Sequence, residues 1–377
     1  MKHIRIGLVG AGFMGKTHLW SVRNLPFFYR TAELDYTAEV VAVCASTPER
    51  GEAFAREYGI PHVATAEEMI ADPSIDVIDI CTPNPLHFAV AEAAILAGKS
   101  VLCEKPLTVT AEKAEELAKL AEERGVICGT VFNNRFLAPV MRARQLIDEG
   151  RLGRILSFEF TYKHNSCIDP DRRMGWKQTA EAGGGTWYDL GPHAVDLCHY
   201  LCGELSFVLG RSQIAYPTHL RADETVWETN ADEAFYVICG TRDGAMGTVT
   251  VSKLTQGAND ELSFSVNGER GSLSFSLMDP NYLNFYDATA PGSPMGGVRG
   301  YTRIECVGRY PSPASGFPAI KAPQGWLRGH IGCMAGYFSA VASGTDCSPS
   351  FADGAYVQRI LEAALESDRN GREVRLC

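Results

Sequence analysis

The stretch IRIGLVGAGFMG, residues 4–15, joins an apolar run to three glycines spaced as GxGxxG. A strand that turns through glycines into a helix presents backbone N–H groups and the positive end of a helix to a phosphate. Gly10 permits the tight turn, Gly12 lets a pyrophosphate approach the main chain, and Gly15 lets the helix pack closely. Such a pattern also occurs in ordinary turns, but here it follows an apolar strand and opens a helix. It therefore predicts a dinucleotide-binding site.

Size and charge narrow the class of protein. The chain has 377 residues, 45% of them hydrophobic, which is enough for about two or three domains with cores of their own. Its formal net charge of −10, without a run of lysines or arginines, disfavours a nucleic-acid partner. The N-terminus lacks the pattern of a secretion signal, and no stretch approaches the ~20 apolar residues of a membrane span. We expect a cytoplasmic globular protein without a membrane partner.

The twelve cysteines read as small buried hydrophobes, because several of them stand in apolar runs typical of strands. Cys198 and Cys202, one helical turn apart beside His199, come closest to a pair of metal ligands. Two thiols on a buried helix face is the simpler interpretation. We therefore predict a reducing compartment and no metal site.

The first third of the chain alternates between strand and helix patterns. Apolar runs indicate strands at 3–9, 39–44, 76–80 and 100–103, with helices near 13–24, 48–58 and 86–97 between them. A further helix at 110–124 and a strand at 126–130 follow. Such alternation predicts a parallel sheet with helices on both faces. We assign residues 1–132 to a Rossmann NAD(P)-binding domain.

The remainder, 133–377, has the pattern of a second domain. From about residue 153, short strands without intervening helices are indicated at 155–162, 234–239, 245–251, 262–266 and 273–275. The fold class is therefore α/β, a Rossmann domain followed by an α/β domain with an open, mostly antiparallel sheet. Residues 288–326 are expected to be irregular. Two closing helices, near 330–343 and 354–367, could pack back on the first domain.

Three further motifs occur in order along the chain: CTPNPLH at 81–87, EKP at 104–106, and GGG at 183–185 followed by DLGPH at 189–193. Together with the glycine loop, they resemble the Gfo/Idh/MocA family of sugar and cyclitol dehydrogenases over nearly the whole chain. The layout is most similar to enzymes that oxidise a ring hydroxyl of a monosaccharide or anhydrosugar, such as levoglucosan and glucoside 3-dehydrogenases. The resemblance implies a homodimer or homotetramer formed through the second-domain sheet. In the family, the peptide bond that corresponds to Lys105–Pro106 is often cis, whereas X-Pro bonds in general are mostly trans. The sequence leaves the isomer open.

The resemblance also implies a catalytic trio of Lys105, Asp189 and His193. Hydride transfer from a secondary alcohol requires a nicotinamide ring against the carbinol C–H and a base for the hydroxyl proton. Lys105 would contact the nicotinamide ribose and the substrate hydroxyl, and His193 would be the general base, a residue type suited to this role because an unperturbed imidazole titrates near pH ~6.5. In a helix Asp189 would share a face with His193 and either orient it or bind a sugar hydroxyl. The alternatives are a loop lysine, a core histidine and a helix-capping aspartate.

Cofactor contacts are expected from every turn that follows a strand of the first domain. Thr82, Asn84 and His87 match family positions along the cofactor, although their prolines could simply form a rigid turn. The complete set of expected cofactor-binding residues is Gly10, Gly12, Phe13, Met14, Gly15, Ser46, Thr47, Arg50, Thr82, Asn84, His87, Glu104 and Lys105.

The choice between NAD and NADP depends on the turn after the strand at 39–44. An NAD enzyme often has a carboxylate there to bind the ribose 2′-OH, and none is present. Ser46, Thr47 and Arg50 could instead hold a 2′-phosphate. A helix N-cap followed by a surface arginine explains the same residues, so the pattern favours NADP and leaves NAD open.

Substrate contacts are expected from the long segment 163–204 and its approach. Aromatic faces pack on sugar C–H groups while polar groups read hydroxyl orientation. The expected substrate-binding residues are Tyr162, Asn165, Arg172, Trp176, Lys177, Asp189 and His193. Further candidates are His164, Arg173, Trp187 and Tyr188. The resemblance also implies that Asn133, Asn134 or Arg135, at the domain junction, lies near the nicotinamide or the substrate.

The predicted activity is transfer of hydride between a ring hydroxyl of a monosaccharide, anhydrosugar or cyclitol and NAD(P). Two alternatives remain open. One is a glycosidase that uses tightly held NAD for transient oxidation and elimination. The other is a nicotinamide-binding sensor without turnover, against which the intact set of Lys105, Asp189 and His193 argues.

Overall fold

The computed structural model describes residues 1–29, 34–168, 175, 179–220, 223–307 and 325–376. Contacts along the chain divide it into two compact units. The first unit contains Met1–Phe136 and Trp326–Gln358, and the second contains Leu137–Val307 and Arg359–Cys377. Helix α9 (Trp326–Ser343) and the start of α10 (Phe351–Asn370) therefore belong to the first unit. The sequence left open whether these closing helices pack back on the first domain.

The first unit is built on a six-stranded sheet in the order β3-β2-β1-β4-β5-β6. All its pairs are parallel, which confirms the predicted Rossmann type of sheet. The strand order reverses at β1, whose neighbours are β2 and β4; ligands of such sheets bind outside the carboxyl ends of the strands at this point. The strands are β1 (Lys2–Val9), β2 (Tyr36–Cys44), β3 (His62–Val63), β4 (Val77–Ile80), β5 (Ser100–Cys103) and β6 (Cys128–Thr130).

Two hydrophobic cores cover the two faces of this sheet. Ile6 and Leu8 of β1 pack in one core with residues of α1 and α9, whereas Ile78 of β4 packs in the other with residues of α4 and α5. Burial on both faces explains why these strands are predominantly apolar. The helices are α1 (Phe13–Phe28), α2 (Pro48–Tyr58), α3 (Ala66–Ala71), α4 (His87–Leu96) and α5 (Ala111–Arg124), with the short 3-10 turns η2 (Asn84–Leu86) and η3 (Asn133–Phe136).

The second unit contains a nine-stranded sheet in the order β16-β15-β14-β13-β7-β12-β11-β8-β17. Only the pair of β7 and β12 is parallel, so the sheet is mostly antiparallel as predicted. Its strands are β7 (Ile155–Lys163), β8 (Leu205–Gln213), β11 (Ala234–Thr241), β12 (Met246–Ser252), β13 (Glu261–Gly268), β14 (Gly271–Ser276), β15 (Tyr282–Asp287), β16 (Tyr301–Glu305) and β17 (Val374–Arg375). A separate ribbon pairs β9 (Thr218–Leu220) with β10 (Val226–Glu228).

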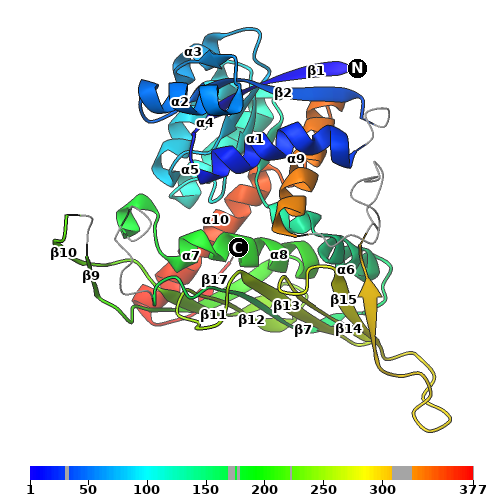
Figure 1. The fold of residues 1–377 in the computed structure, drawn as a ribbon. Helices are drawn as coiled ribbons and strands as arrows, with labels where there is room; N and C mark the ends of the chain where they lie inside the picture. Colours follow the sequence, from blue (N-terminus) through cyan, green and yellow to red (C-terminus); the bar gives the residue numbers. More distant parts are fainter. Residues whose placement is uncertain (30–33, 169–174, 176–178, 221–222, 308–324, 377) are drawn as a thin grey trace. The chain divides into compact units, whose positions relative to one another are not determined.

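Helices line one face of the nine-stranded sheet, as Figure 1 shows for α6 (Ala138–Asp148), α7 (Thr186–Asp189) and α8 (Gly191–Cys202). Helix α8 packs on β7 and β12. Burial alternates along the strands, with Phe158 and Phe160 of β7 buried and Glu159 exposed. The sheet therefore holds α7 and α8, which carry Asp189 and His193, against a fixed core.

Several short elements were not predicted from the sequence, namely β3, α3, β9, β10, β15 and β17. Three further differences have a physical cause. Residues 301–305, expected to be irregular, form the strand β16; within the described part of the chain it pairs only with β15 and is largely exposed, so it shows no apolar alternation. Strand β8 was missed because Gly210 stands at an inward position, where a Cβ would lie 2.5 Å from the carbonyl oxygen of Ala364. Helix α1 runs to Phe28, beyond the expected end at residue 24, with Pro26 inside its last turn.

Among the described residues, no helix combines the length and apolar character that a membrane crossing demands.

Candidate active site

The glycine turn after β1 requires glycine for reasons that the backbone makes explicit. Gly10 has φ 118°, and a Cβ there would lie 2.5 Å from the carbonyl oxygen of Cys81, so the turn runs directly against the end of β4. A Cβ on Gly15 would overlap the carbonyl oxygen of Gly10. A Cβ on Gly12 would meet no atom within 4 Å. The main chain at the start of α1 is thus open where the other two glycines are closely packed.

This opening fits a dinucleotide phosphate. Gly12 is the N-cap of α1 and makes no side-chain cap, so the first turn of a 16-residue helix keeps N–H groups for an anion. Among the described residues, the Oγ1 atom of Thr82 is buried without a hydrogen-bond partner, in the turn that follows β4. Open backbone and an unsatisfied hydroxyl at adjacent strand ends are what a nucleotide ligand would satisfy.

An aromatic pair flanks the glycine turn. The ring of Phe13 is 72% exposed and stacks on Trp326 at the start of α9, with centroids 5.9 Å apart. Met14 beside it is half-buried. No local pattern in the sequence marks Trp326 as a partner of Phe13, because more than 300 residues of chain separate the two.

The turn after β2 holds Ser46, Thr47 and Arg50 together. Thr47 caps α2 by accepting the backbone N–H of Arg50 at 3.4 Å, which is the structural alternative that the sequence allowed for it. The guanidinium of Arg50 donates to the hydroxyl of Ser46 at 3.1 Å on the exposed surface. A cation and a hydroxyl thus lie side by side at the carboxyl end of β2.

His87 connects two loops at the sheet edge and is fully buried. Its Nδ1 lies 3.0 Å from the carbonyl oxygen of Pro106, and its Nε2 lies 2.9 Å from that of Thr82. Burial lowers the pKa of His87, so the neutral ring is favoured. Its position indicates that it shapes the turn at Thr82 and the loop at Pro106.

Lys105 follows β5 directly and is half-buried, with a cis bond to Pro106, the isomer that the sequence left open. The backbone N–H of Lys105 donates to Oε2 of Glu104 at 3.1 Å. Glu104 is 5% exposed, and its other oxygen lies 3.0 Å from Nε2 of His18 in α1. Although burial would raise the pKa of Glu104, His18 and Lys105 lower it to about 2, so the carboxylate is ionised.

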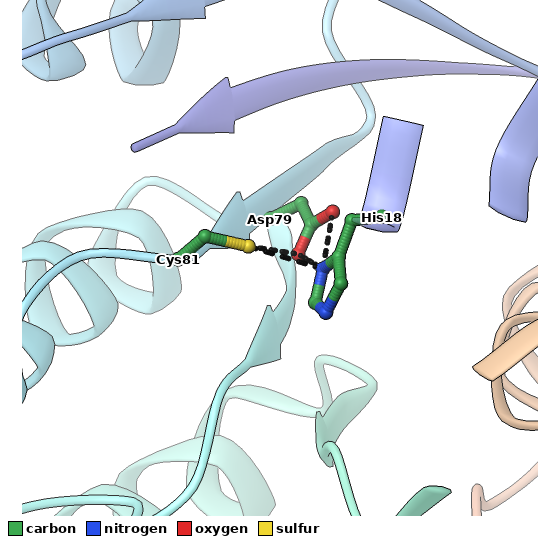
Figure 2. Close-up of side chains that lie close together, drawn as sticks. All are labelled: His18, Asp79 and Cys81. Carbon is green, nitrogen blue, oxygen red and sulfur yellow. Dashed lines mark hydrogen bonds and ion pairs between the residues drawn. The ribbon is translucent and has the colours of Figure 1, made fainter. Parts of the chain in front are cut away.

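His18 continues this network toward β4. Its Nδ1 lies 2.9 Å from Oδ1 of Asp79 and 3.1 Å from the sulfur of Cys81, and Figure 2 shows the ring directed at both side chains. Neither His18 nor Asp79 was a predicted site residue. The only available signal was a histidine three positions after the last glycine of the turn, inside the expected helix.

The second unit contains a cluster around Asp189 and His193. Asp189 ends α7 and His193 stands in the first turn of α8, with Leu190 between the two helices. The ammonium of Lys253, directly after β12, lies 2.6 Å from Oδ2 of Asp189. The side chain of Lys253 is only 6% exposed and that of Asp189 20%, so the pair is largely shielded from water. Lys253 was missed because nothing local marks a lysine at a strand end.

Asp232 places the start of α7. Its carboxylate accepts the backbone N–H of Trp187 at 2.8 Å, and its carbonyl oxygen accepts that of Thr186 at 2.9 Å. Gly185 has φ 98°, and a Cβ there would overlap Oδ1 of Asp232. Burial raises the pKa of Asp232 to about 7. The glycines before α7 thus let the chain pass under this carboxylate and set the helix that presents Asp189.

Tyr162, a predicted substrate-binding residue, is only 4% exposed, and its ring lies against that of His193 with centroids 5.7 Å apart in an edge arrangement. Its hydroxyl donates to Oδ1 of Asp260 at 2.6 Å, and Nε2 of His164 lies 3.0 Å from the same oxygen. Burial would raise the pKa of Asp260, but the bonds from His164 and Tyr162 lower it. Asp260 is a further residue that sequence reasoning missed.

The other predicted site residues lie in different environments. Trp187 is a core residue, stacked on Phe235 at 4.6 Å and bonded to the carbonyl oxygen of Leu361, so the expected substrate contact is wrong for it. Arg135 is buried in an ion pair with Asp353 at 2.9 Å. Asn165 is exposed, Tyr188 half-buried, and Asn133 and Asn134 buried. Arg172, Arg173, Trp176 and Lys177 lie outside the described residues.

Comparisons with known proteins define the class. A family model described as "Oxidoreductase family, NAD-binding Rossmann fold" matches residues 4–132, and one described as "GFO/IDH/MocA C-terminal domain" matches residues 140–274. The class is that of NAD-binding oxidoreductases with relatives that act on sugars and cyclitols. The chain belongs to the GFO/IDH/MocA family, which confirms the resemblance seen in its motifs.

Two curated relatives extend over nearly the whole chain. Levoglucosan dehydrogenase of Pseudarthrobacter phenanthrenivorans is 31% identical over 382 residues, covering 97% of this chain and 96% of the relative. Inositol 2-dehydrogenase of Rhizobium meliloti is 25% identical over 373 residues, covering 98% of each. A solved structure of levoglucosan dehydrogenase in complex with NADH and levoglucosan superimposes with a TM-score of 0.94 at 28% identity, covering 100% of both chains.

Proposed function

We propose that this enzyme oxidises a ring hydroxyl of an anhydrosugar, monosaccharide or cyclitol with NAD(P), with Lys105, Asp189 and His193 acting on the substrate. The observation that carries the proposal is the half-buried Lys105 at the carboxyl end of β5, in the same unit as the open glycine turn. Similarity to levoglucosan dehydrogenase along 97% of the chain supports an anhydrosugar first.

The proposed roles follow from the chemistry of each group. Bound NAD(P) would supply the ring that accepts the hydride. His193 would take the hydroxyl proton, a task typically worth about 10²- to 10⁴-fold in rate. The ammonium of Lys105 would stabilise the developing alkoxide. Asp189, whose carboxylate pairs with Lys253, is an acceptor suited to a sugar hydroxyl or to an N–H of His193.

The cofactor is proposed to be NADP in preference to NAD. The contact of Arg50 with Ser46 at the end of β2 supports this choice, because a guanidinium binds a phosphate through two N–H groups. The similar levoglucosan dehydrogenase structure contains NADH, so both cofactors belong in every assay.

Assembly as a homodimer or homotetramer also remains a proposal. The nine-stranded sheet has apolar side chains on its exposed face. Three of them are each about half exposed: Tyr236 and Ile238 of β11, and Met246 of β12. Contact with a second copy would remove this apolar surface from water. Light scattering during size-exclusion chromatography measures the assembly.

The decisive experiment incubates the protein with each nicotinamide cofactor and a set of levoglucosan, monosaccharides and inositols, and follows formation of the reduced cofactor. Turnover that depends on both cofactor and sugar supports the proposal. Cleavage of a glycoside without net cofactor reduction would identify the redox-elimination glycosidase instead. Binding of the cofactor without turnover of any sugar would identify a sensor.

A further inference from the structure

His18 joins three segments of the first unit that the proposed function uses. It belongs to α1, whose N-terminus faces the glycine turn, and its ring is fully buried. One ring nitrogen lies 2.9 Å from Asp79 of β4, and the other lies 3.0 Å from Oε1 of Glu104, which follows β5. The second oxygen of Glu104 accepts the backbone N–H of Lys105. A continuous hydrogen-bonded path therefore runs from α1 to the backbone of Lys105.

The path has a defined protonation state. A neutral imidazole donates through one nitrogen only, whereas both nitrogens of His18 lie at hydrogen-bond distance from carboxylate oxygens. Although burial would lower the pKa of His18, Asp79 and Cys81 raise it well above the usual value. The ring is thus an imidazolium between two carboxylates. Buried charges of this kind are stable only when every partner is present, which makes the arrangement rigid.

Among the described residues, α9 places two more titratable groups near the ring, Cys333 and His330. Burial raises the pKa of the Cys333 thiol, so it stays protonated and neutral. The ring of His330 lies 6.2 Å from that of His18, and burial lowers the pKa of His330 to about 3, so it stays neutral. The positive charges near Glu104 are therefore those of His18 and Lys105. If His18 lost its charge, Lys105 would be the remaining positive charge that stabilises the Glu104 carboxylate.

We propose that His18 is a positioning residue for Lys105, which it fixes through Glu104 while tying the same loop to α1 and β4. The proposal rests on the proposed role of Lys105 in catalysis. Its consequence is that the lysine and the glycine turn keep one relative position, because α1 and the backbone of Lys105 share a single buried ion network. Small displacements of a reacting group are costly, about 10²-fold in rate for 1 Å.

A metal ion is the competing occupant. Ligand atoms of His18, Asp79 and Cys81 lie within 4.8 Å of one another, as do those of His18, Glu104 and His330. Nitrogen-to-oxygen distances of 2.9 and 3.0 Å are those of N–H···O hydrogen bonds, which favours protons in these positions. Metal analysis of the purified protein separates the two.

The test compares the wild type with His18→Gln and Glu104→Gln, and uses Val22→Ala as the matched control. Val22 lies one turn further along α1 and is buried, but its side chain makes no hydrogen bond. The main readout is the pH dependence of Lys105 labelling by an amine-reactive reagent, quantified by peptide mass spectrometry with and without NADPH. This readout needs no sugar turnover, so it remains informative if the proposed activity is wrong.

We expect both network variants to shift the labelling profile, weaken its protection by NADPH and lower kcat about 10²-fold, while Val22→Ala lowers only the melting temperature. If His18→Gln fails to fold, the test rests on Glu104→Gln, because this substitution keeps the shape of the side chain. In wild-type protein with ¹⁵N-labelled histidine, one imidazole should keep both ring nitrogens protonated well above the usual pKa of about 6.5. Wild-type-like labelling and kcat in Glu104→Gln, no such imidazole, or stoichiometric metal would each overturn the proposal.

Discussion

The ammonium of Lys253 lies 2.6 Å from the carboxylate of Asp189, and both side chains are largely shielded from water. Removing one partner of such a pair leaves the other charge unpaired in a site where desolvation is expensive. Asp189 is therefore an ionised acceptor whose orientation depends on a lysine 64 residues away.

This pair leads to the first prediction. Lys253→Met should reduce kcat/KM with the best sugar by about ten- to a hundredfold, because the carboxylate of Asp189 loses its partner and its orientation. Steady-state kinetics across pH provide the measurement, and Lys163→Met, on the neighbouring strand β7, is the control. Unchanged kinetics in Lys253→Met would show that the pair only supports the fold.

The proposed catalytic trio predicts non-additive losses of activity. Lys105→Ala and His193→Ala should each nearly abolish turnover while binding of the reduced cofactor, followed by fluorescence, is retained. Since both groups are proposed to act in the same step, the double variant should be little worse than the poorer single one. Exposed His62 and Lys119 supply matched alanine controls. Retained turnover in either single variant would remove that residue from the proposed mechanism.

Two glycines of the same turn should respond in opposite ways. Gly12→Ala places a methyl group in open space at φ −88°, so the variant should fold normally but bind either cofactor at least about tenfold more weakly. Gly15→Ala drives a methyl group into the carbonyl oxygen of Gly10, so it should lower the melting temperature markedly. Thermal unfolding and cofactor titration together measure both effects. Normal cofactor affinity in Gly12→Ala would contradict a phosphate site at this turn.

The proposed preference for NADP rests on Arg50. Arg50→Ala should weaken NADPH binding by about ten- to a hundredfold, the usual range for a lost charge-assisted hydrogen bond, and leave NADH binding unchanged. Arg56, exposed in the same helix, provides the control variant. Equal effects on both cofactors would favour the reading of Arg50 as a surface residue beside a helix cap.

Asp232 predicts a pH dependence of stability. Its pKa is raised to about 7 by burial, so between about pH 4 and 7 the folded protein binds a proton that the unfolded chain has released. The contribution of Asp232 is full below pH ~4 and is lost as the pH rises to about 7, with a slope of up to about 1.4 kcal/mol per pH unit.

Denaturant unfolding at several pH values checks this. Asp232→Asn keeps an oxygen for the N–H of Trp187 but cannot ionise, and should flatten the free energy of unfolding over that range. An unchanged slope in the variant would show that Asp232 titrates normally.

Much of the fold could be predicted because its signals are local. The parallel strands are predominantly apolar, the helices α2 and α5 begin at threonine caps and end at glycines in the left-handed region, and the motifs occur at the expected turns. Strand β8 was not predicted because it has a glycine at an inward position, and β16 was not predicted because it is an exposed edge strand. Trp187 was misjudged because an aromatic residue in a polar segment looks the same in sequence whether it faces a sugar or the core.

The amino-acid sequence by itself determined the dinucleotide turn and the class of fold, because glycine spacing and apolar periodicity act over one or two turns of backbone. Only the tertiary structure decided which charges meet: His18 with Asp79 and Glu104, and Lys253 with Asp189. Such pairs depend on the register of strands and the packing of helices that are distant in sequence. A buried charge is stable only beside its partner, so these contacts follow from the completed fold and leave no local pattern.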